Sequence, residues 1–277
     1  MIEIGHYNTL KVTELVTFGA YLTDGHDEVL LPSKWVTKSL SEGDELEVFV
    51  YTDSEDRPIA TLEQPKAQVG EFALLEVVDT TQYGAFVDWG LSKDLLVPFA
   101  EQEPRLRVGD WAVFYIDINN QTGRPVASNR LNRYFDYDVD HINENVEVDL
   151  MVYGHNQVGS LVIVNGRHRG IIYHDQSFKH LSVGERVTGF VATVREDNRI
   201  DVTLTRRGHG GTLDAKEIIL EKIRATGGTL RLHDKSHPDE IRASLQMSKK
   251  RFKSAIGGLY KEGLIVFVDN GVKLTNS

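Results

Sequence analysis

The sequence contains no cysteine among its 277 residues. The chain therefore forms neither disulfide bonds nor thiolate metal sites, which is typical of proteins from a reducing compartment. Long apolar runs are also missing: residues 264–268 are among the longest, far short of the ~20 residues of a membrane-spanning helix. Residues 1–6 show neither the basic region nor the apolar core of a signal peptide. We expect a cytoplasmic protein without a membrane partner.

Motifs of common catalytic sites are missing too. The sequence has no Gly-x-Ser-x-Gly, no phosphate-binding Gly-x-x-x-x-Gly-Lys-[Ser/Thr] and no His-Glu-x-x-His. The 10 histidines show no ligand spacing, and the acidic residues are spread over turns. Asp136, Asp138 and Asp140 begin like a calcium-binding loop, but His141 stands where that loop requires glycine, so a solvated linker is preferred. We expect no enzyme activity, no cofactor and no bound metal.

Positive charge is scarce and unevenly distributed. The chain has 31 Lys and Arg against 41 Asp and Glu, a net charge of −10. Residues 1–144 hold 11 basic against 26 acidic side chains, whereas residues 145–277 hold 20 against 15. Lys and Arg contacts to phosphate supply most nonspecific affinity for nucleic acids. This asymmetry therefore predicts that the phosphate-binding surface lies in the C-terminal half.

An internal repeat organises residues 1–207. A glycine flanked by apolar or aromatic residues recurs at Gly19, Gly84 and Gly159, and each copy is followed by an apolar run. A glycine–acid pair begins 24, 25 and 25 residues later, and an arginine follows after 14, 15 and 15 more. These later landmarks are Gly43, Gly109 and Gly184, then Arg57, Arg124 and Arg199. Landmarks in near-constant register, three times over, define a repeat.

The last part of the chain changes from a strand-like period to a helical one. Ser236 and Ser248 are expected to cap helices, and Asn270-Gly271 is expected to form a hairpin turn. The expected elements are helices over 213–225, 236–245 and 248–262, then a hairpin of 264–268 and 272–274. A helix, a helix-turn-helix and a hairpin in this order indicate a winged helix.

The repeated [Phe/Tyr]-Gly-Ala-aromatic-[Val/Leu] core and the glycine–acid pair resemble the S1 RNA-binding domain, a five-stranded OB-type barrel. The resemblance is strong in the second copy, fair in the first and weaker in the third. With the C-terminal segment, the whole chain resembles the conserved virulence factor B family, which implies an RNA-binding regulator without catalytic chemistry. We therefore predict a mainly β multidomain protein: three tandem S1-like OB-type β-barrels and a small α+β winged-helix domain. The expected domains are 1–66, 67–132, 145–207 and 212–277.

Tyr83 and Phe86 are the sharpest candidates for base contacts. Nonspecific binding of single strands uses flat aromatic faces, and each stacked base contributes ~1–3 kcal/mol. The alternative is that both belong to the barrel core, because strand alternation places positions 83 and 86 on opposite faces unless Gly84 forms a bulge. For Phe18 and Tyr21 both interpretations stay open, since the acidic first repeat repels phosphate.

Other candidates are expected to contact phosphate. The third repeat brings several arginines together with Tyr173, which either stacks a base or packs under the barrel rim. On the third helix of the last domain, a basic arc lies beside the core-facing stripe of Phe252, Ala255, Ile256 and Leu259 and is either solvated or a nucleic-acid surface. The predicted RNA-binding residues are Tyr83, Phe86, Arg130, Arg167, Arg169, Tyr173, His174, Arg199, Arg206, Lys249, Lys250, Lys253, Tyr260 and Lys261.

Together these features predict a sequence-tolerant protein that binds single-stranded RNA and regulates gene expression after transcription. One alternative is a winged-helix transcription regulator that binds duplex DNA. Another is an adaptor whose acidic barrels bind a basic protein, such as a ribosomal protein. Stacking aromatics favour single strands, whereas a DNA reader normally requires a dimer, for which no obvious helix is present.

Overall fold

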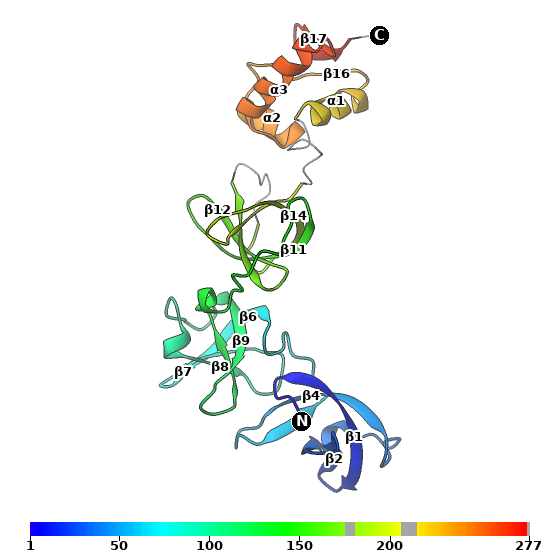
Figure 1. Cartoon of the computed structure of the whole chain (residues 1–277), viewed down its shortest axis with the longest axis vertical. Helices are drawn as coiled ribbons and strands as arrows, with labels where there is room; N and C mark the ends of the chain where they lie inside the picture. The colour runs from blue at the N-terminus through cyan, green and yellow to red at the C-terminus, as the bar shows by residue number, and fades with distance from the viewer. Residues whose placement is uncertain (175–180, 206–214, 276–277) are drawn as a thin grey trace. The chain divides into compact units, whose positions relative to one another are not determined.

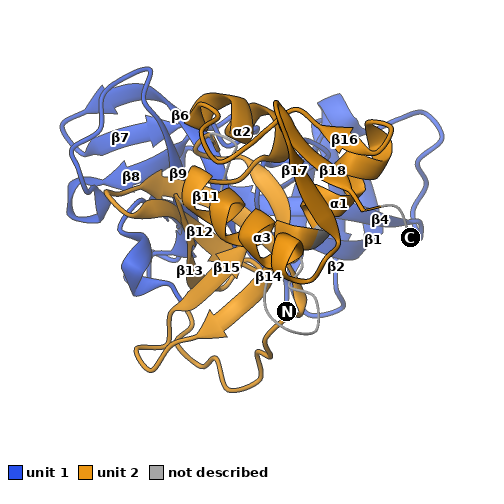
Figure 2. Ribbon diagram, turned by 90° about the horizontal axis from the view of Figure 1, so that it is seen from above, with its two compact units in different colours: residues 1–135 blue, residues 136–277 orange. Residues whose placement is uncertain are grey.

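The computed structural model describes residues 1–174, 181–205 and 215–275 (Figure 1). The described residues form mainly β-strands, with three α-helices near the C-terminal end. The chain divides into two compact units, residues 1–135 and residues 136–277, which are coloured separately in Figure 2. The predicted fold class is confirmed: three five-stranded barrels, closed or nearly closed, precede a winged helix.

The first barrel is closed, with the strand order β1-β2-β3-β5-β4 and a final pairing of β4 with β1. Its strands are β1 (His6–Val16), β2 (Gly19–Thr23), β3 (Glu28–Pro32), β4 (Glu45–Thr52) and β5 (Pro58–Thr61). Leu10, Val12, Leu22 and Leu31 point inward and are almost fully buried. Alternation along these strands therefore encloses an apolar core of the barrel's own.

The second barrel repeats this order in a nearly closed sheet, whose edge strands β8 and β10 lie side by side. Its strands are β6 (Phe72–Thr81), β7 (Gly84–Val87), β8 (Leu95–Pro98), β9 (Trp111–Ile118) and β10 (Pro125–Ser128). The third barrel is closed and consists of β11 (Glu147–His155), β12 (Gly159–Val164), β13 (His168–Tyr173), β14 (Arg186–Val194) and β15 (Ile200–Thr203). The internal repeat therefore corresponds to one barrel per copy.

A shared irregularity bends the first strand of each barrel. The register shifts between Val12 and Glu14 in β1, and β6 and β11 shift at the corresponding place. A bulge of this kind increases the bend and twist of a strand, which allows a short sheet to curl toward closure. The three copies thus share this β-bulge as well as their sequence landmarks.

The glycine of the repeated motif marks a close approach between the second and third strands of each barrel. A Cβ atom at Gly84 would lie 2.2 Å from the carbonyl oxygen of Val97, and one at Gly159 would lie 2.1 Å from that of Ile172. A Cβ atom at Gly19 would likewise lie 2.2 Å from the carbonyl oxygen of Leu31. Any side chain here would push the paired strands apart, so the motif requires glycine on steric grounds.

Replacing this glycine should destabilise the barrel, and the third barrel offers a matched control. We expect Gly159→Ala to lower stability by about 1–3 kcal/mol through overpacking. Gly154→Ala should change it by less than about 0.5 kcal/mol, because its Cβ would meet only Leu161 Cδ1 at 3.9 Å. Hydrogen exchange of the β12 and β13 amides in the full chain measures both effects. Equal exchange rates in the two variants would contradict the steric explanation.

Within residues 1–135 the first two barrels are joined by an aromatic contact. Phe49 of β4 belongs to the apolar cluster of the second barrel, where Trp89 meets it edge to face at 5.4 Å. The indole Nε1 of Trp89 donates a hydrogen bond to the carbonyl oxygen of Ala67 at 2.7 Å. Val69 N donates to the Gly5 carbonyl oxygen at 3.0 Å. These contacts explain why the first two repeats form one compact unit.

The C-terminal domain has the predicted winged-helix order and one additional short strand. Its elements are α1 (Ala215–Ala225), β16 (Thr229–Leu230), α2 (Pro238–Leu245), α3 (Lys249–Lys261), β17 (Ile265–Val268) and β18 (Gly271–Leu274). The strands form a sheet in the order β16-β18-β17, and the predicted hairpin is confirmed. Its two-residue turn is Asp269-Asn270 rather than the predicted Asn270-Gly271, because Gly271 already belongs to β18 and pairs with Val268. None of the helices in the described part of the chain has the length and apolarity required to cross a membrane.

Of the two predicted helix caps, Ser248 is confirmed and Ser236 is wrong. The Ser248 side chain accepts a hydrogen bond from Arg251 N at 3.3 Å, which confirms it as the cap of α3. The cap of α2 is His237 rather than Ser236, because Pro238 occupies the first helical position and keeps the preceding residue extended. Ser236 is instead buried and accepts a hydrogen bond from His233 N at 3.1 Å.

Candidate nucleic-acid interface

Tyr83 and Phe86 both lie outside the barrel core. Tyr83 sits in the turn before β7 and is 68% exposed, and Phe86 is half-buried opposite Leu96 of β8. The core positions of β7 are taken by Ala85 and Val87. Strand alternation does not bury either aromatic, because Tyr83 precedes the strand and Gly84 begins it with φ 154°.

The two aromatics line one cavity of about 430 Å³. Tyr51, in β4 of the first barrel, lines it as well, and so does Trp89. The remaining lining includes the cationic side chains of Lys93 and Arg124. Flat apolar walls with a few polar groups are typical of sites for small aromatic ligands.

Charges around this cavity are mixed. Lys93 Nζ donates hydrogen bonds to the carbonyl oxygens of Thr52 and Asp53 at 3.1 and 2.6 Å. Burial lowers the pKa of Lys93, whereas burial and the charges of Asp88 and Asp79 raise the pKa of Asp94. Both shifts have the same cause, because a low-dielectric surrounding disfavours the charged form of each group. In the lining, Lys93 and Arg124 balance the charges of Asp56 and Asp94, whereas residues 1–144 hold 11 basic against 26 acidic side chains, so the cavity is less acidic than the half of the chain around it.

The same positions differ among the three barrels. In the first barrel Phe18 is exposed and Tyr21 is half-buried, and their rings meet edge to face at 6.2 Å. In the third barrel Val158 is exposed and Leu161 is half-buried. Each barrel thus has one exposed and one half-buried side chain at these two positions. In the third barrel both are aliphatic, and aliphatic side chains do not stack on bases.

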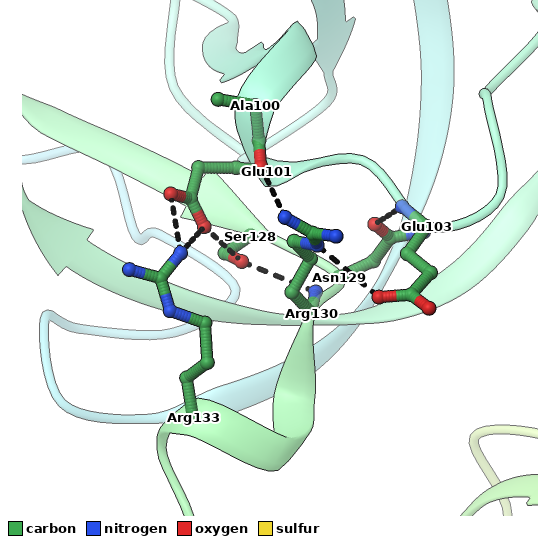
Figure 3. A network of polar contacts seen from close by, with 7 residues as sticks. All are labelled: Ala100, Glu101, Glu103, Ser128, Asn129, Arg130 and Arg133. Atoms are coloured by element: carbon green, nitrogen blue, oxygen red, sulfur yellow. Dashed lines mark hydrogen bonds and ion pairs between the residues drawn. The ribbon is translucent and has the colours of Figure 1, made fainter.

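Arg130 lies in a polar network beside β10 and outside the cavity lining (Figure 3). Its Nε donates to Glu103 Oε2 at 3.1 Å and its Nη1 donates to the Ala100 carbonyl oxygen at 3.2 Å. Nearby, Glu101 accepts hydrogen bonds from Arg133 Nη1 and Ser128 Oγ, each at 2.8 Å. These contacts tie the turn after β8 to the end of β10, so Arg130 already has a structural partner of opposite charge.

In the third barrel, Arg169 and Arg199 both lie near Tyr153, whereas the Tyr173 hydroxyl accepts a hydrogen bond from Arg195 Nη1 at 3.3 Å. Arg169 and Tyr173 are four residues apart in β13 and therefore share a face, and the Tyr173 hydroxyl donates to Asp201 Oδ1 at 3.4 Å. Burial raises the pKa of Tyr153, while the nearby charges of Arg169 and Arg199 oppose the rise. Tyr153 lies in β11 and was missed, because no repeat landmark falls on it.

The remaining predicted residues of this barrel are more scattered. Arg167 is exposed in the turn between β12 and β13. His174 follows β13 and is exposed, with Nε2 3.3 Å from the Asn156 carbonyl oxygen. Arg206 lies outside the described residues. Among its described residues, the third barrel thus brings Arg169 and Arg199 near Tyr153 and Arg195 to Tyr173.

The basic arc of α3 is exposed as predicted, with one exception. Lys250, Lys253, Tyr260 and Lys261 are exposed, whereas Lys249 is half-buried and its Nζ donates to the Ser236 carbonyl oxygen at 2.9 Å. The predicted core stripe is confirmed by the burial of Phe252, Ala255, Ile256 and Leu259.

The wing adds an aromatic ring to this face. Phe267 of β17 is exposed, and its ring centroid lies 5.1 Å from that of Tyr260. Residues 266–268 are consecutive, apolar and exposed in β17. Sequence reasoning assigned this run to an ordinary hairpin strand, although three exposed apolar residues in a row are a signal of a contact surface.

OB-type barrels followed by a winged helix define a multidomain protein built from nucleic-acid-binding domains. The S1 domain family matches residues 4–63, and the CvfB-like winged helix domain family matches residues 217–274. The reported S1 match therefore falls on the first repeat, although the motif residues alone are strongest in the second.

The chain belongs to the conserved virulence factor B family. The uncharacterized protein YitL of Bacillus subtilis (strain 168) is 34% identical over 278 residues, which cover 96% of this chain and 92% of that protein. Conserved virulence factor B of Staphylococcus epidermidis (strain ATCC 12228) is 29% identical over 242 residues, with 84% and 80% covered. A crystal structure described as a multidomain protein with nucleic acid binding domains, from Streptococcus pneumoniae, covers 98% of both chains at 21% identity and a TM-score of 0.42.

Proposed function

We propose that this protein binds single-stranded RNA with little sequence preference, regulates gene expression after transcription, and performs no catalysis. The observation that carries the proposal is the position of Tyr83 and Phe86, which lie outside the core and line the same cavity. Unpaired bases stack on such side chains whatever their identity, because every base has a flat π-face. OB-type barrels commonly bind oligonucleotides on the face that contains their second and third strands.

Affinity for the backbone comes from other parts of the chain in this proposal. The exposed Lys250, Lys253 and Lys261 of α3 contact phosphates, and Arg169 and Arg199 of the third barrel add to them. Phosphate contacts position a strand without selecting its bases, which accords with sequence-tolerant binding. The acidic surface of residues 1–135 limits contact with phosphate to the few cations around the cavity.

The arrangement of α2 and α3 also supports a second candidate, binding to duplex DNA. The two helices form a helix-turn-helix, and α3 occupies the position of a recognition helix that enters the major groove. Its basic arc suits either nucleic acid. The aromatic pair of the second barrel has no task in duplex binding, and for this reason we favour single strands.

Titrating the full chain with fluorescent single-stranded RNAs of equal length and different base composition tests the proposal. We expect similar affinities for all of them, with inorganic polyphosphate as a weaker competitor, because it supplies charge but no bases to stack. Binding to polyphosphate as tight as to RNA would mean that the surface recognises charge alone.

A further inference from the structure

The cavity at Tyr83 and Phe86 is built by two barrels. Thr52, Ser54 and Asp56 line it from the end of β4 and the turn that follows in the first barrel. The second barrel supplies the aromatic pair and the side chains of Lys93 and Arg124. A site carried by the second barrel alone would lack this entire wall.

The turn of the first barrel is held in place from both sides. Within it, Asp53 Oδ1 accepts hydrogen bonds from Glu55 N and Arg57 N at 2.8 and 2.9 Å, so its conformation is set internally. Across the junction, Lys93 Nζ donates to the Thr52 and Asp53 carbonyl oxygens, and Arg124 forms an ion pair with Asp56. The wall is therefore preorganised, which lowers the entropic cost of binding a ligand against it.

The chemistry of the lining suits one nucleotide. Tyr51, Tyr83 and Phe86 offer flat faces to a base, and the volume of about 430 Å³ falls within the ~300–1,000 Å³ usual for small-molecule sites. Arg124 is exposed, and a guanidinium carries five N–H donors in a fork that matches phosphate oxygens. We propose that the cavity binds a single nucleotide, with its base against Tyr83 and Phe86, its phosphate at Arg124, and the turn of residues 53–56 as its second wall.

This proposal rests on the proposed function in one respect, because the nucleotide is either part of an RNA strand or a free mononucleotide. In this proposal, residues of the first barrel form part of the nucleotide site of the second barrel. Asp56 then competes with the phosphate for Arg124, and any added negative charge on the turn repels the ligand.

Two substitutions on the exposed turn test it in opposite directions. Ser54→Glu should weaken binding by about fivefold or more, since like charges ~4 Å apart repel by ~1 kcal/mol even in water. Ser39→Glu is the matched control: it is exposed on the same barrel, outside the cavity lining, and changes the net charge equally. Asp56→Asn should strengthen binding several-fold by releasing Arg124, a gain that a folding defect does not produce.

The probes are a single-stranded RNA of about 12 nucleotides, within the ~4–16 nucleotides that one OB fold binds, and the four mononucleotides AMP, GMP, CMP and UMP. The nucleotide site is supported if Ser54→Glu and Asp56→Asn shift affinity in opposite directions for RNA, for mononucleotides or for both. A shift seen with RNA alone identifies a nucleotide of the strand as the ligand. RNA binding that depends on Tyr83 and Phe86, with Ser54→Glu indistinguishable from Ser39→Glu, overturns the two-barrel site and leaves the proposed function standing. Mononucleotide binding without RNA binding overturns the proposed function and leaves the two-barrel site standing.

Discussion

Alanine at both Tyr83 and Phe86 is expected to weaken the binding of single-stranded RNA by at least about fivefold. Loss of the base that stacks on this pair removes ~1–3 kcal/mol, and 1.4 kcal/mol corresponds to a factor of ten. Stacking releases no counterions, so the slope of log affinity against log salt should stay nearly unchanged. Fluorescence anisotropy at several salt concentrations measures both quantities.

Trp111→Ala provides the matched control for this experiment. Trp111 is an exposed aromatic residue of β9 on the same barrel, and it does not line the cavity. We expect its replacement to leave RNA affinity within about twofold of the original. Unchanged affinity in the Tyr83 and Phe86 double variant, with hydrogen exchange showing an intact barrel, would contradict the stacking role.

The second large effect is expected from α3. Replacing Lys250, Lys253 and Lys261 together with glutamine should flatten the salt slope by roughly 2, because each phosphate neutralised on a single strand contributes ~0.7. Lys249 is left out of this set, since its Nζ donates to the Ser236 carbonyl oxygen and its loss would disturb the domain. The loss should be alike for different RNA sequences.

A charge-matched variant separates a local surface from net charge. Arg224, Arg231 and Arg242 are exposed in the same domain and lie outside α3, so their replacement by glutamine removes the same charge from other faces. We expect this second variant to change the slope by less than about 0.5. Equal flattening in both variants would assign the effect to overall charge, and no flattening in either would leave α3 without a phosphate contact.

The elements that could be predicted from sequence are those specified by local chemistry. Spacing of the motif glycines indicated three barrels, because each glycine meets a strict backbone constraint such as the one at Val97. Helical periodicity in α3 predicted the buried stripe, since one face of a helix is set by the sequence itself. The cap of α2 was misplaced by one residue, because both Ser236 and His237 have side chains that accept a backbone hydrogen bond.

Features that depend on contacts between segments far apart in the sequence could not be predicted in this way. Trp89 lies directly after the repeated motif, but nothing in its neighbourhood indicates that it packs on Phe49 of another repeat. The same limit applies to the cavity, whose wall at Ser54 comes from a turn of another repeat. For Tyr83, the boundary between turn and strand decided its exposure, and periodicity does not define such boundaries.

A competition assay tests most directly whether this protein binds single strands of RNA. Full-length protein bound to a labelled single-stranded RNA is challenged with unlabelled single-stranded RNA, single-stranded DNA and duplex DNA of the same sequence and length at one salt concentration. We predict that single-stranded RNA competes best, that single-stranded DNA follows, and that duplex DNA competes least, since its bases are unavailable for stacking on Tyr83 and Phe86. Strongest competition by duplex DNA would contradict the preference for single strands and assign the winged helix a role in DNA binding.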